Sequence, residues 1–253
     1  MQTERIVLRP RRPGEAIELG LHLTRANWLP QVGLVSIALA PIALLGLALS
    51  QWFAPGLLLT LIWFKPTVDR VLLHQLSQDL LGRDRGLSAA LRDWRDWWYG
   101  GHTASLLWHR FSPARSLVLP VWQLERLSGA ARRRRIRVLA HDNRGAGASL
   151  SLVAAVIELS FLLSLAALIA TLVPEQWTEG LYFMDWLSVT AQIDSIWLLV
   201  GLAYLPVIAL VEPFYVGGGF GLYLNQRIRL EGWDLEPRLH AIAERHGRAQ
   251  GPE

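Results

Sequence analysis

The sequence predicts an all-α polytopic membrane protein, with about four transmembrane helices in two hairpins and amphipathic helices at the membrane surface. Three observations support this fold class. Hydrophobic side chains make up 52% of the 253 residues, a composition typical of membrane proteins. Residues 29–50 contain no charged side chain, and such a segment forms a helix of about 33 Å, long enough to cross a hydrocarbon core. Residues 149–173 and 193–224 are long apolar runs that contain few acidic residues.

The apolar segment 51–64 is shorter, about 21 Å as a helix, and we interpret it as a second span. Ala54-Pro55-Gly56 predicts a tight turn before it. The helix can continue past Lys65, whose side chain is then expected to snorkel toward the headgroups. The alternative is a re-entrant or interfacial first hairpin, which preserves the same sidedness.

Basic residues are segregated along the chain, and this sets the predicted orientation. Five lie in residues 1–28, fifteen in 65–147 and five in 225–253. The positive-inside rule then places both termini and the large loop in the cytoplasm of a bacterium, with the protein in its inner membrane. The expected units are a cytoplasmic tail with an interfacial helix (1–28), a first hairpin (29–64), a basic Trp-rich cytoplasmic or interfacial platform (65–147), a second hairpin (148–224) with an acidic outer loop (174–192), and a cytoplasmic tail (225–253).

The first unit carries an amphipathic pattern. Ile17, Leu21, Thr24 and Trp28 share one face of a helix, with charged side chains on the other faces. This spacing favours a helix that lies in the membrane interface and leads into the first span.

Glu158 and Tyr204 are candidate partners inside the membrane. Glu158 lies about 14 Å into its span, near the midplane, where an isolated carboxylate is costly. Tyr204 falls at a similar depth in the antiparallel last span. The pair is interpreted either as part of a proton or cation relay, or as a protonated acid bonded to Tyr204 that fixes helix packing.

Glu212 lies near the cytoplasmic end of the last span, in a segment that predicts a broken or kinked helix with close backbone approach. The residues of this segment are Glu212, Pro213, Gly217, Gly218, Gly219 and Gly221. One interpretation is a polar pocket for a lipid headgroup or substrate. The other is a packing joint that ties Glu212 to an Arg of the large loop.

The platform is expected to bind anionic lipid headgroups. Aromatic rings suit the headgroup layer, and an Arg near an anionic surface contributes about 1 kcal/mol of attraction. The residues concerned are Trp94, Trp97, Trp98, Arg132, Arg133, Arg134 and Arg135. Nucleic-acid binding is the rejected alternative for the Arg run, because the membrane accounts for the aromatic residues.

The chain shows no catalytic motif. It has no cysteine, its seven histidines are dispersed, and no nucleophile elbow, phosphate-binding loop or dinucleotide fingerprint is visible. We therefore expect no enzymatic activity, catalytic residue, metal or cofactor.

The closing segment from Tyr223 to Glu236, YLNQRIRLEGWDLE, resembles the end of bacterial multi-span proteins related to the membrane domain of glycerophosphodiester phosphodiesterases. In those proteins a span ends in Tyr, followed by a polar residue, a basic pair and Glu-Gly-x-Asp-Leu-Glu. The opening segment 14–28, GEAIELGLHLTRANW, is similar to the amphipathic helix that starts such domains. The resemblance covers about a fifth of the chain. It implies membrane architecture without phosphodiesterase activity, since the catalytic His-Arg-Gly and paired acids have no counterpart here.

Two functions remain open from the sequence. The first is a non-enzymatic inner-membrane scaffold or complex subunit that binds anionic lipid and partner proteins through its platform. The resemblance implies a MoxR-type AAA+ ATPase system as one such partner. The alternative is a small transporter or lipid-handling protein that uses Glu158 and the Glu212 to Gly221 segment.

Overall fold

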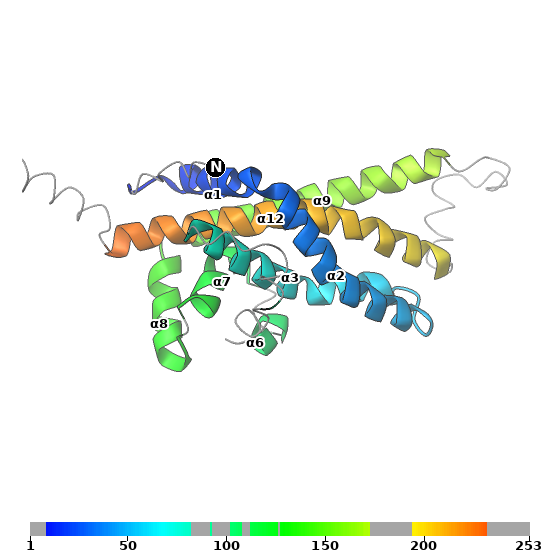
Figure 1. Ribbon diagram of the computed structural model, residues 1–253, viewed down its shortest axis with the longest axis horizontal. Helices are drawn as coiled ribbons and strands as arrows, with labels where there is room; N and C mark the ends of the chain where they lie inside the picture. The colour runs from blue at the N-terminus through cyan, green and yellow to red at the C-terminus, as the bar shows by residue number, and fades with distance from the viewer. Residues whose placement is uncertain are drawn as a thin grey trace, which may run out of the picture.

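A computed structural model describes residues 9–81, 92, 102–107, 112–125, 127–172 and 194–231. This part of the chain is helical and contains no strand, as the sequence predicts (Figure 1). In chain order the helices are α1 (Pro13–Ala26), α2 (Trp28–Ser50), α3 (Gly56–Leu80), α6 (His102–Leu107), α7 (Arg115–Gln123), α8 (Gly129–Ala140), α9 (Arg144–Leu172) and α12 (Asp194–Glu231).

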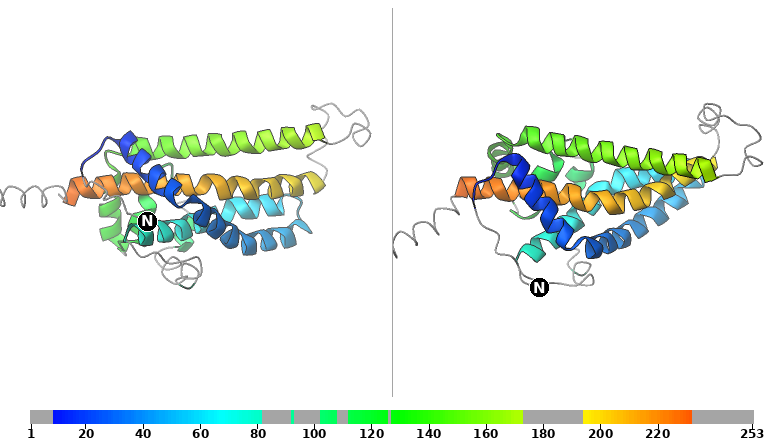
Figure 2. Two further views of the ribbon diagram at one scale, coloured as in Figure 1. Left: turned by 45° about the horizontal axis from the view of Figure 1, so that its top comes forward. Right: turned by 90° about the horizontal axis from the view of Figure 1, so that it is seen from above.

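The longest helix, α12, lies at the centre of the arrangement. It packs against α1, α2, α3, α7 and α9. Helices α9 and α12 lie side by side, and α2 and α3 lie side by side next to them (Figure 2). The buried core between these helices includes Leu57, Leu61, Ile208, Phe220 and Leu222. Helix α12 is therefore the element against which the other helices are positioned.

In the part of the chain that the structure describes, three helical segments are long and apolar enough to cross a membrane, judged by length and composition: Trp28–Ser50, Arg144–Leu168 and Trp197–Glu231. Their outward side chains fit that assignment. Leu44 on α2, with 68% of its surface exposed, and Leu152 on α9, with 66%, are examples. Such apolar exposure is stable when lipid rather than water surrounds the helices.

The predicted short second span takes a different form. Residues 51–55 make the turn that Ala54-Pro55-Gly56 indicates, and α3 then runs without a break through Lys65 and Pro66. The continuation of the helix past Lys65 is confirmed. Its second half is buried, as Val68, Leu72 and Leu76 show. Helix α3 is therefore one long helix with an apolar first part and charged side chains in its middle.

Helix α1 packs closely against the last part of α12 (Figure 1). Pro13 starts α1, and its buried face consists of Ala16, Gly20 and Thr24, which are small and spaced four residues apart. A methyl carbon added at Gly20 would lie 2.0 Å from the carbonyl oxygen of Gly217. The two backbones approach so closely because neither glycine carries a side chain.

Polar contacts secure both ends of this helix pair. The side chain of Asn225 accepts a hydrogen bond from the backbone N–H of Arg11 at 2.7 Å. It also donates a hydrogen bond to the backbone carbonyl oxygen of Arg11 at 3.0 Å. At the other end the Thr24 hydroxyl donates to the carbonyl oxygen of Pro213 at 3.3 Å. Of the predicted interfacial stripe, Thr24 is buried, Ile17 and Leu21 are half-buried and Trp28 is exposed.

Helix α12 is continuous from Asp194 to Glu231, although Pro206 and Pro213 lie inside it. The segment from Glu212 to Gly221 is therefore not broken, and the kink that the sequence offered as the alternative stays a prediction. The expected close backbone approach is confirmed, because methyl groups added at Gly217, Gly219 or Gly221 would collide with α1 or with Ser116. The glycines make room for neighbouring helices instead of ending this one.

Candidate functional site

Glu158 of α9 is held between two other helices. The Tyr204 hydroxyl of α12 donates a hydrogen bond to Glu158 Oε2 at 2.8 Å, which confirms the predicted pairing. The Lys65 ammonium of α3 makes an ion pair with Glu158 Oε1. The expectation that Lys65 snorkels is wrong, because its side chain is 15% exposed and its charge lies among carboxylates. The ion pair compensates the cost of placing Glu158 in an apolar bundle.

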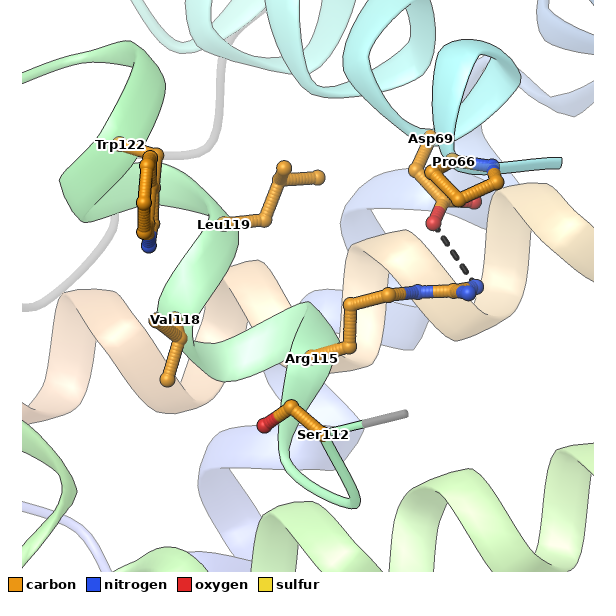
Figure 3. A pocket seen from close by; sticks show the side chains of 7 residues that line it. All are labelled: Pro66, Asp69, Ser112, Arg115, Val118, Leu119 and Trp122. Atoms are coloured by element: carbon orange, nitrogen blue, oxygen red, sulfur yellow. Dashed lines mark ion pairs between the residues drawn. The ribbon is translucent and has the colours of Figure 1, made fainter. Parts of the chain in front are cut away.

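Glu212 of α12 is fully buried beside the same lysine. Its Oε2 lies 2.9 Å from Lys65 Nζ, and its Oε1 lies 3.5 Å from an Nη of Arg115 at the start of α7. Arg115 is an Arg of the large loop, so the predicted joint between Glu212 and that loop is confirmed. The same Nη also lies 2.8 Å from Asp69 Oδ2 of α3 (Figure 3).

Together these side chains form one buried ionic cluster, composed of Lys65, Asp69, Arg115, Glu158 and Glu212. Its three carboxyl groups and two cations leave one formal negative charge when all five are ionised. Burial of an uncompensated charge is expensive, so the cluster has a strong tendency to bind a proton or a positive group.

A cavity of about 300 Å³ adjoins the cluster. Its polar wall is built from α3, α7, the segment just before α7, α9 and α12, and consists of Lys65, Ser112, Arg115, Ser151, Glu158, Tyr204 and Tyr215. Its apolar wall includes Ile62, which is 38% exposed, and Ala155, which is also exposed. The cavity thus joins a charged interior to apolar surface on α3 and α9.

The Tyr215 side chain links the cavity wall to α9 and α7. Its hydroxyl lies 3.0 Å from Ser151 Oγ, and the Arg115 guanidinium carbon lies 5.5 Å from its ring centroid, within reach of a cation–π interaction. Figure 3 shows how Arg115 extends from α7 toward Asp69 on α3. These contacts hold the Arg115 guanidinium in a fixed position, which is a requirement for a selective binding site.

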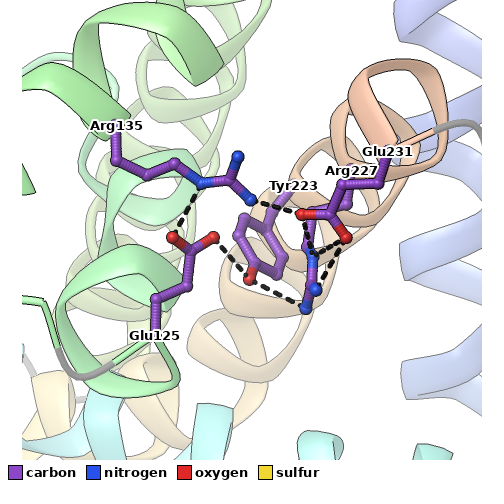
Figure 4. Close-up of polar contacts among 5 residues, drawn as sticks. All are labelled: Glu125, Arg135, Tyr223, Arg227 and Glu231. Carbon is purple, nitrogen blue, oxygen red and sulfur yellow. Dashed lines mark hydrogen bonds and ion pairs between the residues drawn. The ribbon is translucent and has the colours of Figure 1, made fainter.

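A second polar cluster joins α8 to the end of α12 (Figure 4). Arg135 makes ion pairs with Glu125, at 2.8 Å, and with Glu231. Tyr223 donates to Glu125 at 3.0 Å, and Arg227 pairs with Glu231 at 2.8 Å. The hydrogen bond to Glu125 is the main reason why the pKa of Arg135 lies above its ordinary value.

The other arginines of the predicted lipid-binding run differ in their surroundings. The Arg132 guanidinium stacks over Trp122 at 3.3 Å from the ring centroid, whereas Arg133 and Arg134 are exposed. Two of the four arginines are therefore engaged within the protein, and a lipid-facing role for the run stays a prediction. Trp94, Trp97, Trp98, the loop 174–192 and the tail after Glu231 lie outside the described residues.

Within the described ranges, no three His, Asp or Glu side chains are grouped to hold a metal ion. His102 of α6 is buried and faces Thr67, whose Oγ1 lies 3.5 Å from His102 Nε2. Burial, and then the nearby Arg70 guanidinium, lower the pKa of His102 to about 4. His102 is therefore a neutral, structural side chain at neutral pH.

Sequence reasoning identified Glu158, Tyr204 and Glu212, and missed the two cations that bring them together. One sequence pattern could have indicated a charge pair at Lys65, because this lysine is followed four residues later by Asp69 inside a helical pattern. No such pattern marks Arg115, because it lies in the middle of the long basic segment 65–147. Comparison with protein-family models, curated proteins and solved structures finds no match for this chain.

Proposed function

We propose that this chain is a lipid-handling membrane protein that takes the polar head of a membrane amphiphile into the cavity between α3, α7, α9 and α12. The cavity itself carries the proposal. It has room for a headgroup, with a volume of about 300 Å³, and it combines charged walls with exposed apolar residues on α3 and α9. An amphiphile requires both kinds of surface, whereas a free polar solute requires only the first.

The residues around the cavity favour the entry of a lipid from the bilayer, between α3 and α9. Trp63 on α3 and Leu159 on α9, which follow the cavity residues Ile62 and Glu158 in the sequence, are 44% and 57% exposed. In the topology that we propose, α3 is a fourth crossing and the helices form two hairpins, with both termini in the cytoplasm. The exposed apolar side chains of α3 and α9 then face lipid, and acyl chains remain in the bilayer while the headgroup reaches Lys65.

A cavity-filling variant tests this proposal. Ala155→Phe places a ring in the cavity wall and leaves every residue of the ionic cluster unchanged, and Ala167→Phe adds the same ring at an exposed position of α9 that does not line the cavity. Native mass spectrometry of each detergent-purified chain measures the retained lipid. We expect Ala155→Phe to lose a lipid that the wild type and Ala167→Phe retain. Equal lipid retention in both variants contradicts the proposal.

A second candidate function is a scaffold that binds anionic lipid and partner proteins through its basic platform. The observation that favours it is α8, which presents Arg133, Arg134 and Arg137 as exposed side chains. A variant with Gln at these three positions, purified in mild detergent from the native membrane, is expected to lose a protein partner that the wild type carries in stoichiometric amount. If the wild type carries no partner, the scaffold function is excluded.

A further inference from the structure

The cavity wall offers cationic hydrogen-bond donors to a ligand. The Lys65 ammonium has three N–H donors, of which one donates to Glu158 Oε1, while Glu212 Oε2 lies 2.9 Å from Nζ as an ion pair. Arg115 Nε is buried and has no hydrogen-bond partner among the described residues. Both cations line the cavity, while Asp69 and Glu212 do not line it and are at most 1% exposed. A ligand therefore meets two cations and one carboxylate, that of Glu158.

The chemistry of these groups selects an acidic phosphate ester. Lys and Arg donate strong, charge-assisted hydrogen bonds to phosphate oxygens. The Ser112 hydroxyl at the same wall supplies a neutral partner for an ester or glycerol oxygen. Because the neighbouring exposed surface is apolar, the matching ligand is the head of an acidic phospholipid.

The negative charge of the cluster repels a phosphodiester unless the cluster takes up a proton when the ligand binds. With all five groups ionised the cluster already carries one negative charge, and a phosphodiester adds another in a site of low polarity. The groups that face Glu158 from the packed helices are Lys65 and Asp69 of α3, Arg115 of α7, and Tyr204, Glu212 and Tyr215 of α12.

Among the three acids, Glu158 is the one that lines the cavity and that competes with the ligand for Lys65. We infer that the cavity binds the phosphodiester head of an acidic membrane lipid against Lys65 and Arg115, and that the ionic cluster takes up one proton from solvent when the lipid binds. This inference rests on the proposed lipid-handling function.

The test is calorimetric titration of the full chain in mild detergent with dihexanoyl phosphatidylglycerol, whose phosphodiester keeps its single charge over the working pH range. Titrations in buffers of different ionisation enthalpy count the protons taken up, without any variant. We expect one proton per lipid, and an association constant that rises about tenfold for each unit of falling pH while the free site is deprotonated. Dihexanoyl phosphatidylcholine, which carries no net charge, is expected to bind without proton uptake.

Two variants sharpen the test. Glu158→Gln keeps the shape and an acceptor for Tyr204 and removes the excess negative charge of the cluster, so it is expected to bind phosphatidylglycerol without proton uptake and at least as tightly as the wild type does at low pH. Lys65→Met is expected to bind at least tenfold more weakly. Equal affinity of Lys65→Met and the wild type overturns the inference, as does phosphatidylglycerol binding to the wild type without proton uptake.

The outcomes separate this inference from the function on which it rests. Lipid that binds in the cavity without a proton contradicts the inference and leaves lipid handling in place. Dimethyl phosphate, which has the same charged group without acyl chains, distinguishes a lipid from a free phosphodiester. If it binds as tightly as phosphatidylglycerol, the site recognises a soluble anion and the lipid-handling function is wrong.

Discussion

A methyl group at Gly20 should separate α1 from α12. The added carbon would lie 2.0 Å from the carbonyl oxygen of Gly217 and 3.0 Å from Gly218 Cα. Because backbone cannot rotate away as a side chain can, α1 must withdraw by about 1 Å to restore a normal contact. Gly20→Ala is therefore a severe change even though it adds a single carbon.

The magnitude follows from three contributions. Overpacking costs about 1–3 kcal/mol. Withdrawal of α1 also weakens its hydrogen bonds to Asn225 and Pro213, each worth about 0.5–1.5 kcal/mol. Replacement of a helical glycine by alanine returns about 0.5–1 kcal/mol. The expected net loss is about 2–4 kcal/mol in the free energy of unfolding.

Gly14→Ala is the matched control, since Gly14 lies in the same helix and an added methyl group meets nothing within 4 Å. The chain contains 12 tryptophans, so intrinsic fluorescence reports thermal unfolding in detergent. With about 2–4 °C for each kcal/mol in a chain of this size, Gly20→Ala should melt at least about 5 °C below Gly14→Ala. Equal melting temperatures would refute the close approach of the two helices.

Two further predictions concern the polar groups outside the membrane-spanning helices. Arg135→Met loses two ion pairs with partly exposed carboxylates, so it should lower the melting temperature relative to Arg133→Met, and the difference should shrink in high salt because such pairs are screened. A difference in melting temperature that does not change with salt would mean that Arg135 stabilises the protein through packing and not through its ion pairs. For His102 the pKa in the folded protein, about 4, lies below the ordinary value of about 6.5, so stability is lost as pH falls from about 6.5 to 4. His102→Gln should therefore lose less stability between pH 7 and pH 5 than the wild type or the exposed-site control His22→Gln, and parallel losses in all three would contradict a neutral, buried His102.

The pairing of Glu158 with Tyr204 could be predicted from the sequence because it depends only on counting along two straight helices. A residue's depth in a helix is its distance from the end multiplied by a fixed rise, and two antiparallel spans place residues of equal depth opposite each other. The close approach at Gly217 and Gly221 could be predicted for a similar reason. Glycine in an apolar helix signals that another backbone comes near, whichever helix supplies it.

The cations of the cluster could not be predicted in the same way. The sequence allowed the helix to continue past Lys65 but placed that side chain at the headgroups, whereas its ion pairs with Glu158 and Glu212 place it inside the bundle. Arg115 reaches Glu212 because α7 packs on α12, a contact between segments almost 100 residues apart. Proline at position 213 predicted a break, but α12 passes through it, and the Thr24 hydroxyl binds the carbonyl oxygen there.

The contact between α1 and α12 has a consequence for the biogenesis of the protein. The ribosome makes α1 before α12, yet the partner surface of α1 at Gly217 and Gly221, and the Asn225 clamp on Arg11, belong to α12. Some 200 residues are therefore translated before α1 can dock. Docking of α1 thus has to wait for the synthesis of α12 and requires that α12 is in place.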